Sequence, residues 1–141
     1  MTAKIYLKQI EIMDQRINSK LALLENLKAM ATKTTSTFSD MVVSRTRNNQ
    51  AMEDTIVRIM EMQEQINNDI DRLVALKQEI LGKIQEISDP RMQAILEMRY
   101  VCQKSWHEIA DELHYCESKI FKLHRRALKE IKVPDFIENI Q

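Results

Sequence analysis

Apolar residues recur every seven positions along much of the chain, and this spacing predicts two long amphipathic helices. The first helix is expected over residues 5–31. Its repeat is formed by Ile10, Ile17, Leu24 and Ala31, with Met13, Leu21 and Leu27 between them. The second helix is expected over residues 51–87, and its repeat runs unbroken through Met52, Ile59, Ile66, Leu73, Ile80 and Ile87. A heptad repeat sustained over this length is typical of a coiled coil.

The second predicted helix carries more apolar surface than the first can cover. A second row of its positions reads Ile56, Gln63, Ile70, Lys77 and Ile84. At about 1.5 Å per residue this helix would span roughly 55 Å, whereas the first would span about 40 Å. An exposed row of large apolar residues promotes aggregation, so it must pack on the first helix, on a second copy or on both. We therefore expect a helical hairpin whose uncovered part forms a homo-oligomer, most simply a two-fold dimer, with the six heptad residues of the second helix as the seam.

Residues 32–50 interrupt the heptad pattern. The first half of this segment is rich in hydroxyl and β-branched side chains, which favour caps and turns over helix interiors. The second half has no clear period. We expect a loop that joins the two helices within an N-terminal region of residues 1–88. The pattern leaves open whether the segment is a mobile tether, becomes ordered on binding or is partly helical.

A small domain of three helices is predicted after this region, over residues 89–133. Ser88, Asp89 and Pro90 mark its start, because Ser88 or Asp89 can cap a helix and proline suits the first helical turn. A support helix is expected over residues 91–101, followed by two short helices over 106–113 and 117–132. Ser105 and Glu108 have the spacing of a capping box. Two amphipathic helices joined by the three-residue turn 114–116 are the parts of a helix-turn-helix.

The predicted fold class is therefore all-α, with a long N-terminal helical hairpin followed by a small helix-turn-helix domain. One glycine and two prolines among 141 residues agree with a nearly all-helical chain. Residues 134–141 are expected to form a C-terminal tail, either one last apolar turn or a frayed end.

The formal net charge of zero hides a strong asymmetry along the chain. Residues 51–89 hold four Lys or Arg against nine Asp or Glu, a net charge of −5. Residues 117–132 hold six Lys or Arg against two Glu, a net charge of +4. A basic second helix behind an acidic hairpin favours DNA as the partner, and would orient the molecule on it.

Residues 92–131 resemble the fourth region of primary-type bacterial sigma factors, the segment that reads the upstream promoter element. The matching pieces are ILEMRY (95–100), Ser105, EIADEL (108–113), KI (119–120) and RAL (126–128). His114 stands where that family has Gly, and Cys116 stands where it has a Ser or Thr cap. No segment resembles the polymerase-binding or strand-melting regions of a full sigma factor. The whole chain is similar to small phage and prophage late-transcription regulators of the ArpU and RinA type, which implies a sequence-specific regulator of late promoters.

The resemblance also implies which side chains contact the DNA. The outward residues near the start of the second short helix would touch base edges: Glu117, Ser118, Phe121 and Lys122. Glutamate can accept from a cytosine amino group, and phenylalanine can contact a thymine methyl. The other basic residues of this helix are suited to phosphates: Lys119, Arg125, Arg126 and Lys129. The alternative for Phe121 is packing on Phe136 or on another subunit.

Several function classes find no support in the sequence. The N-terminus is charged throughout, and no run approaches the roughly 20 apolar residues of a membrane span, so a cytoplasmic protein is expected. Cys102 and Cys116 should then be reduced, and their spacing with His107, His114 and His124 fits no zinc-site pattern. We expect no metal and no cofactor. The chain has no Gly-rich phosphate loop, nucleophile elbow or paired carboxylates, so it is not expected to be an enzyme.

Two alternatives keep the predicted architecture and change the role. A phage DNA-packaging recognition subunit, of the small terminase kind, also joins a helix-turn-helix to an oligomerising helical hairpin. A protein-binding adaptor would instead use the sigma-like module to contact RNA polymerase rather than DNA.

Overall fold

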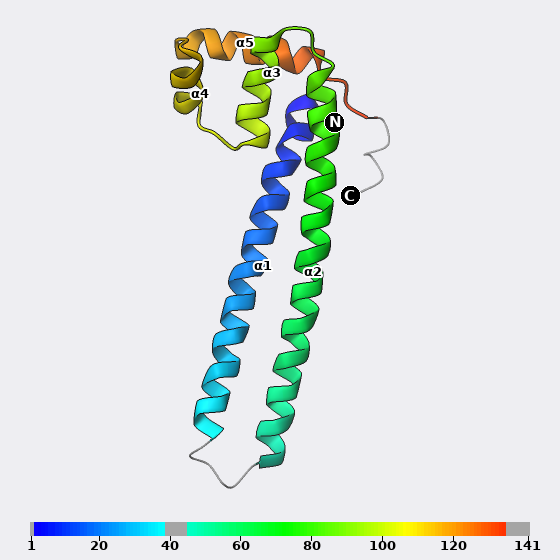
Figure 1. Ribbon diagram of the computed structural model, residues 1–141, viewed down its shortest axis with the longest axis vertical. Coiled ribbons are helices and arrows are strands. Elements are labelled where there is room, and N and C mark those ends of the chain that lie inside the picture. Colours follow the sequence, from blue (N-terminus) through cyan, green and yellow to red (C-terminus); the bar gives the residue numbers. More distant parts are fainter. Residues whose placement is uncertain (1, 39–44, 135–141) are drawn as a thin grey trace. The chain divides into compact units, whose positions relative to one another are not determined.

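The computed structural model describes the backbone of residues 2–38 and 45–134, and the side chains of residues 2–33 and 49–134. Within these ranges the chain contains helices and no strand, which confirms the all-α prediction. The elements are α1 (Ala3–Phe38), α2 (Arg45–Gln85), α3 (Pro90–Leu96), η1 (Glu97–Val101), α4 (Trp106–Leu113) and α5 (Glu117–Glu130) (Figure 1). The chain forms two compact units, one of residues 14–72 and one that combines residues 1–13 with the chain from Leu73 onward.

Both long helices extend further than their apolar period predicted. α1 continues to Phe38 and α2 begins at Arg45, so residues 32–38 and 45–50 of the expected loop are helical, which is the partly helical alternative. Residues 39–44 lie outside the described part of the chain. Two described threonines of these helices bond to the preceding turn, since Thr32 Oγ1 donates to the Lys28 carbonyl at 2.9 Å and Thr55 Oγ1 donates to the Ala51 carbonyl at 2.8 Å. Such bonds let threonine occupy a helix interior at small cost.

The unit of residues 14–72 is a two-helix hairpin with a narrow apolar core. Ile17 and Leu24 of α1 and Ile66 of α2 are buried in it. An ion pair crosses the hairpin, since Lys20 Nζ lies 2.5 Å from Oδ2 of Asp69, a buried residue. A carboxylate in such a place needs its cation, because an unpaired buried charge is strongly destabilising.

α1 covers one flank of the α2 heptad row and leaves the other open. The covered flank includes Met62 and Asp69, whereas Ile56, Gln63 and Ile70 are exposed. The second row predicted from the sequence therefore does not pack on α1 along this part of α2, and its contact with a second copy stays a prediction. α1 packs on the flank that carries Asp69 because Lys20 of α1 forms an ion pair with the Asp69 carboxylate there.

The seam residues of α2 serve packing within the chain. Ile66, Leu73, Ile80 and Ile87 are buried in the single chain, and Met52 and Ile59 are half-buried. The first four residues are therefore not available for the contact between chains that was predicted for them. In the second unit, Tyr6, Leu7 and Ile10 of α1 are fully buried, as are Ile80 and Ile84 of α2.

The start of α3 follows the sequence prediction. Asp89 is the N-cap, and its Oδ1 accepts from the Arg91 amide at 2.9 Å, while Pro90 occupies the first turn. The Gln93 side-chain amide donates to the carbonyls of Gln85 and Ile87, which ties α3 to the end of α2.

The predicted support helix changes its winding half-way. Its second part, η1, is a π-helical turn in which the Cys102 amide donates to the Glu97 carbonyl at 2.9 Å. Tyr100 in this turn is buried, as is Leu96 before it. Gln103 follows in left-handed conformation, with φ of 59°, and its side-chain amide donates to the Tyr100 carbonyl at 2.8 Å.

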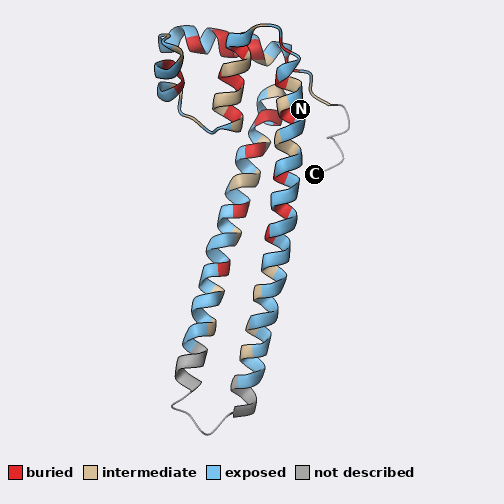
Figure 2. Cartoon of the chain, in the orientation of Figure 1, coloured by how far each residue is buried: buried red, intermediate tan, exposed pale blue. Residues whose placement is uncertain are grey.

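The two short helices, α4 and α5, are joined by a three-residue turn, as the sequence predicts. Both halves of the capping box at Ser105 and Glu108 are present at 3.2 Å. His114 is left-handed, with φ of 57° and ψ of 40°, and the Tyr115 amide closes the turn on the Ala110 carbonyl at 3.1 Å. Figure 2 shows buried residues on the inward sides of α3, α4 and α5. With Tyr100 of η1 and Ile131 after α5, the buried residues of this part of the chain are Met92, Ile95, Leu96, Ile109, Ala110, Ile120, Leu123, His124 and Ala127.

No helix in the described part of the chain is long and apolar enough to cross a membrane. The predicted apolar turn with Phe136 lies outside the described residues, as does the rest of the tail from residue 135 on.

Candidate nucleic-acid interface

The outward side of α5 is open and mostly basic. Its buried side is formed by Ile120, Leu123, His124 and Ala127, at helical spacing. All eight residues that the sequence assigned to DNA contact are exposed: Glu117, Ser118, Lys119, Phe121, Lys122, Arg125, Arg126 and Lys129. The five cations among them point away from the small core, so a polyanion can approach α5 along its length.

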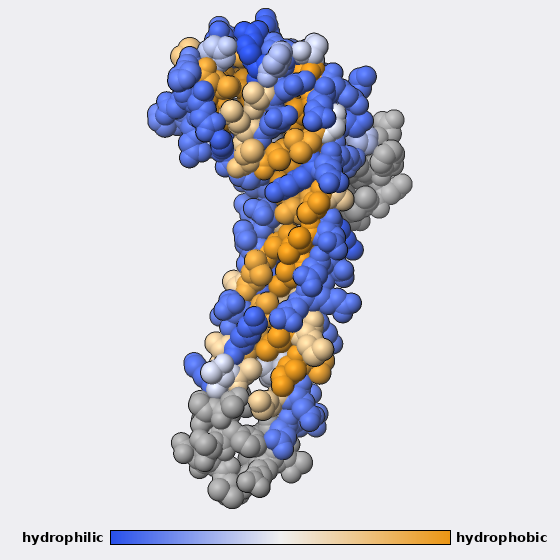
Figure 3. Space-filling model, in the orientation of Figure 1, coloured by the Kyte–Doolittle hydropathy of each residue, from blue (hydrophilic) through white to orange (hydrophobic). Residues whose placement is uncertain are grey.

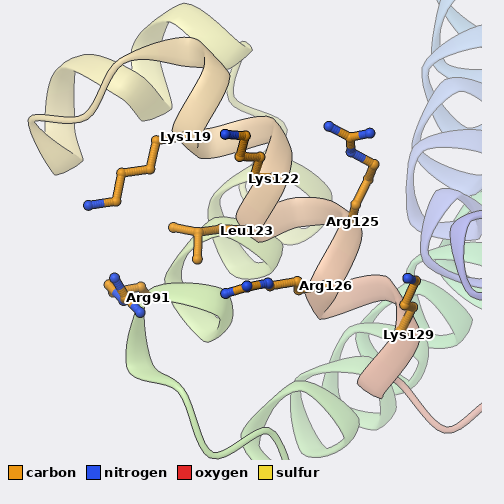
Figure 4. Close-up of a pocket in the computed structure, with 7 residues that line it drawn as sticks. All are labelled: Arg91, Lys119, Lys122, Leu123, Arg125, Arg126 and Lys129. Atoms are coloured by element: carbon orange, nitrogen blue, oxygen red, sulfur yellow. The ribbon is translucent and has the colours of Figure 1, made fainter.

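A groove of about 460 Å³ runs along this side of α5 and is bordered across from it by the first turn of α3. We call it the basic groove. Its lining consists of Arg91, Lys119, Lys122, Leu123, Arg125, Arg126 and Lys129. In Figure 4 the side chains of Lys119, Leu123 and Arg126 extend toward the side where Arg91 lies, while Arg125 points away. Six cations and no carboxylate among the lining residues make this groove suited to an anion.

Arg91 is the residue of this groove that the sequence analysis missed. It sits in the first turn of α3, whose pattern predicted only a support for the reader. Its guanidinium is held by Asp89, with Nη2 at 3.0 Å from Oδ2 and Nε at 3.3 Å from Oδ1. These bonds lower the pKa of the Asp89 carboxyl and raise that of Arg91. The first turn of α3 thus presents a guanidinium in a fixed orientation, and Arg guanidinium geometry suits phosphate oxygens.

Lys119 is also oriented by a neighbour. Its Nζ lies 4.1 Å from the ring centroid of Tyr115, over the ring face. This cation–π contact is weak at an exposed site, so it orients the ammonium without preventing a phosphate from binding it.

The first turn of α5 carries the weakest anchoring of the module. Cys116 is its N-cap and makes no side-chain capping bond, as the departure from Ser or Thr predicted. Glu117 Oε1 lies 3.8 Å from His107 Nδ1, and His107 Nε2 lies 3.4 Å from Asp111, all at exposed positions. An acidic residue in the first turn is favoured by the helix dipole. Ser118 is exposed on the outward side of the same turn.

Phe121 is only partly available for contact with a base. Its ring packs edge-on against Trp106, with centroids 5.2 Å apart, and 39% of the residue remains exposed. The contact shown is with Trp106 of α4, whereas the alternative contact with Phe136 lies outside the described residues. The exposed edge can still meet a thymine methyl, while the other edge fixes α5 against α4.

A buried aromatic cluster supports α5 from beneath. His124 is only 8% exposed, and its Nε2 lies 2.7 Å from the Tyr100 hydroxyl. Trp106 meets the His124 ring edge-on at 4.7 Å, and the Arg99 guanidinium lies 4.6 Å above the Trp106 ring. Burial is the main cause that lowers the pKa of His124 to about 4, with the charges of Lys4 and Arg99 adding to it. His124 is therefore neutral at physiological pH and acts as a core residue.

The cysteines and histidines are dispersed over the module. Cys102 and Cys116 are exposed free thiols. Among the described residues, no three His, Cys, Asp or Glu side chains come together in an arrangement that could hold a metal ion.

The chain belongs to the family DUF1492, described as a protein of unknown function, whose model matches residues 32–132. The matched residues include α2 to α5 and therefore the whole basic groove. No curated protein and no solved structure matches the chain.

Proposed function

We propose that this DUF1492 protein is a sequence-specific DNA-binding transcription regulator that inserts α5 into the major groove. The single observation that carries the proposal is the uncovered basic side of α5, which continues into the basic groove toward Arg91. The resemblance of residues 92–131 to the fourth region of sigma factors supports promoter DNA as the target. Its likeness to late-transcription regulators of phages and prophages supports late promoters.

The contacts divide by their place on α5. Ser118 and Lys122 project from its outward side near the N-terminal end, where a recognition helix meets base edges. Glu117 and the free edge of Phe121 flank them. A lysine can donate to guanine O6 and N7, so Lys122 is the main candidate for sequence readout.

The remaining cations position the protein on the backbone. Arg126 and Lys119 extend from α5 toward Arg91 of α3, and the three form an anion site with guanidinium and ammonium donors from two helices (Figure 4). One phosphate bound there fixes the angle of α5 to the duplex. Arg125 and Lys129 lie outside that site and suit phosphates further along the strand.

DNA selection followed by titration against salt tests the proposal. Lys122→Ala should weaken binding to the selected sequence more than to random DNA. Arg126→Ala should weaken both alike and reduce the slope of log K against log salt by about 0.9 for each phosphate that is no longer neutralised. Arg72→Ala, an exposed arginine of α2, is the matched control and should change neither.

Three results would overturn the proposal. No enriched sequence after selection, together with identical salt slopes in all three variants, would remove DNA binding by α5. RNA polymerase capture that is lost in Lys122→Ala and Arg126→Ala, without DNA binding, would make the module an adaptor. Selection of packaging-site DNA by a ring-shaped oligomer would keep DNA binding and assign it to genome packaging.

A further inference from the structure

A second heptad row on α2 remains exposed within the unit of residues 14–72. Ile56, Met60 and Ile70 are 43%, 63% and 40% exposed. Gln63 and Asn67 complete the row, and both are exposed. The steps along the row alternate between four and three residues, so the five side chains share one side of the helix. This row is separate from the heptad residues buried within the chain. Figure 3 shows apolar side chains in a band along one face of the hairpin helices.

Three residues of this row are placed symmetrically about its centre. Ile56 and Ile70 each lie seven residues from Gln63, one on either side. Two α2 helices that run antiparallel with their Gln63 residues at the centre would place Ile56 of one copy opposite Ile70 of the partner subunit. The two Gln63 amides would meet each other, and each amide carries both a donor and an acceptor. A row that matches itself after a two-fold rotation is the requirement of an isologous contact.

We propose that this face binds a second copy of the chain, so that two hairpins pack face to face as an antiparallel four-helix bundle. The central Gln63 pair fixes the register, as a single polar residue within an apolar helix contact commonly does. The occupant is thus this chain itself, and the contact uses the row beside the heptad seam because the seam is already buried.

The available area agrees with this arrangement. Residues 45–72 of α2 span about 42 Å, and two adjacent helices present a face about 20 Å wide. Such a face covers about 800 Å² per copy, or about 1,600 Å² in total, the size of a standard stable interface. Contact through α2 alone would bury about half as much, which is the range of non-specific contacts. Leu21 of α1 is also exposed, so both helices of this unit offer apolar side chains.

Cysteine cross-linking tests the axis directly. In a background where Cys102 and Cys116 are replaced by Ser, Gln63→Cys should form a disulfide-linked dimer under mild oxidation, because the two-fold axis brings the pair within disulfide reach. Gln65→Cys is the matched control, since Gln65 is an exposed glutamine two residues away on the other flank of the seam, and it should stay monomeric on a non-reducing gel. A mixture of Ile56→Cys and Ile70→Cys proteins should cross-link to each other and not to themselves.

Sedimentation provides the second measurement. The parent protein should be a dimer at micromolar concentration, and Ile70→Glu should shift it to monomer with unchanged helical circular dichroism, since the residue is exposed in the single chain. A monomeric parent would overturn the proposal and leave the face to a different protein. Equal cross-linking of Gln63→Cys and Gln65→Cys, or a disulfide between two Ile56→Cys chains, would equally contradict the antiparallel axis. None of these readouts involves DNA, so they stand apart from the proposed function.

Discussion

Acid should destabilise the module formed by α3, η1, α4 and α5 through one residue, His124. Its pKa is about 4 in the folded protein against 6.5 for an ordinary histidine, because the ring is buried beneath α5. A group with a lowered folded pKa is neutral in the folded state, so protonation favours unfolding. The stability that the neutral His124 ring contributes is fully present above about pH 6.5 and is lost as the pH falls toward about 4.

The magnitude follows from the same two values. A gap of about 2.5 pH units corresponds to about 3 kcal/mol at most. Between about pH 7.5 and 4.5 the free energy of unfolding should fall by about 2.5 kcal/mol from this group, with about half of the fall complete at about pH 5.5. For a urea slope of about 2 kcal/mol per molar, the unfolding midpoint moves down by about 1 M.

Urea unfolding followed by Trp106 fluorescence provides the assay, because Trp106 is the one tryptophan and lies 4.7 Å from the His124 ring. His124→Phe is the comparison, since phenylalanine keeps the ring packing and cannot take up a proton. The variant loses the hydrogen bond between residue 124 and the Tyr100 hydroxyl, which costs about 1 kcal/mol. This cost is the same across the pH window, because burial raises the pKa of the hydroxyl and the hydroxyl therefore does not titrate in acid. The variant's midpoint should therefore be nearly flat over this window. A variant that loses as much stability as the parent would refute the role of His124.

Three further changes have expected outcomes. Asp69→Ala should destabilise the hairpin by about 1–3 kcal/mol in chemical unfolding, because it leaves the Lys20 ammonium without its partner. The double variant Lys20→Met with Asp69→Leu should lose less stability, because it removes both charges. Equal losses in the two proteins would contradict this. Cys116→Ser should raise stability by about 0.5–1 kcal/mol by supplying the missing cap of α5, and a lower melting temperature would count against that explanation. His114→Gly should raise it by up to about 1 kcal/mol, because glycine adopts the left-handed turn without strain, and a destabilised variant would show that the His114 side chain matters instead.

Local signals in the sequence were sufficient to predict the helix starts and the turn of the C-terminal module. The capping box at Ser105, the left-handed turn at His114 and the cap at Asp89 each depend on a few neighbouring residues, and the structure has all three. The π-helical turn that buries Tyr100 had no such signal. It arises because the ring packs on His124, a contact between residues far apart in sequence.

The flank on which α1 packs could not be read from periodicity. The heptad row through Ile66 and Ile80 is apolar whichever of its two flanks faces α1. The flank that stays exposed, with Ile56 and Ile70, is more hydrophobic than the flank that α1 covers. The buried position of Asp69 depends on its pairing with Lys20 across the hairpin, and single-helix patterns do not contain that information.

The candidate site divides in the same way. Helical spacing predicted which α5 residues point outward, and the structure exposes them. Arg91 could be added only when the packing of α3 against α5 placed it across the basic groove from Arg126. His124, weighed from the sequence only as a metal ligand, is part of the core.

Methylation interference on the selected DNA is the sharpest test of major-groove reading by α5, because dimethyl sulfate modifies guanine N7 in the major groove and adenine N3 in the minor groove. We predict that N7 methylation at specific guanines abolishes binding by the parent, and that Lys122→Ala loses sensitivity at one of these positions. Interference confined to adenine N3, or none at all, would contradict a reader that lies in the major groove.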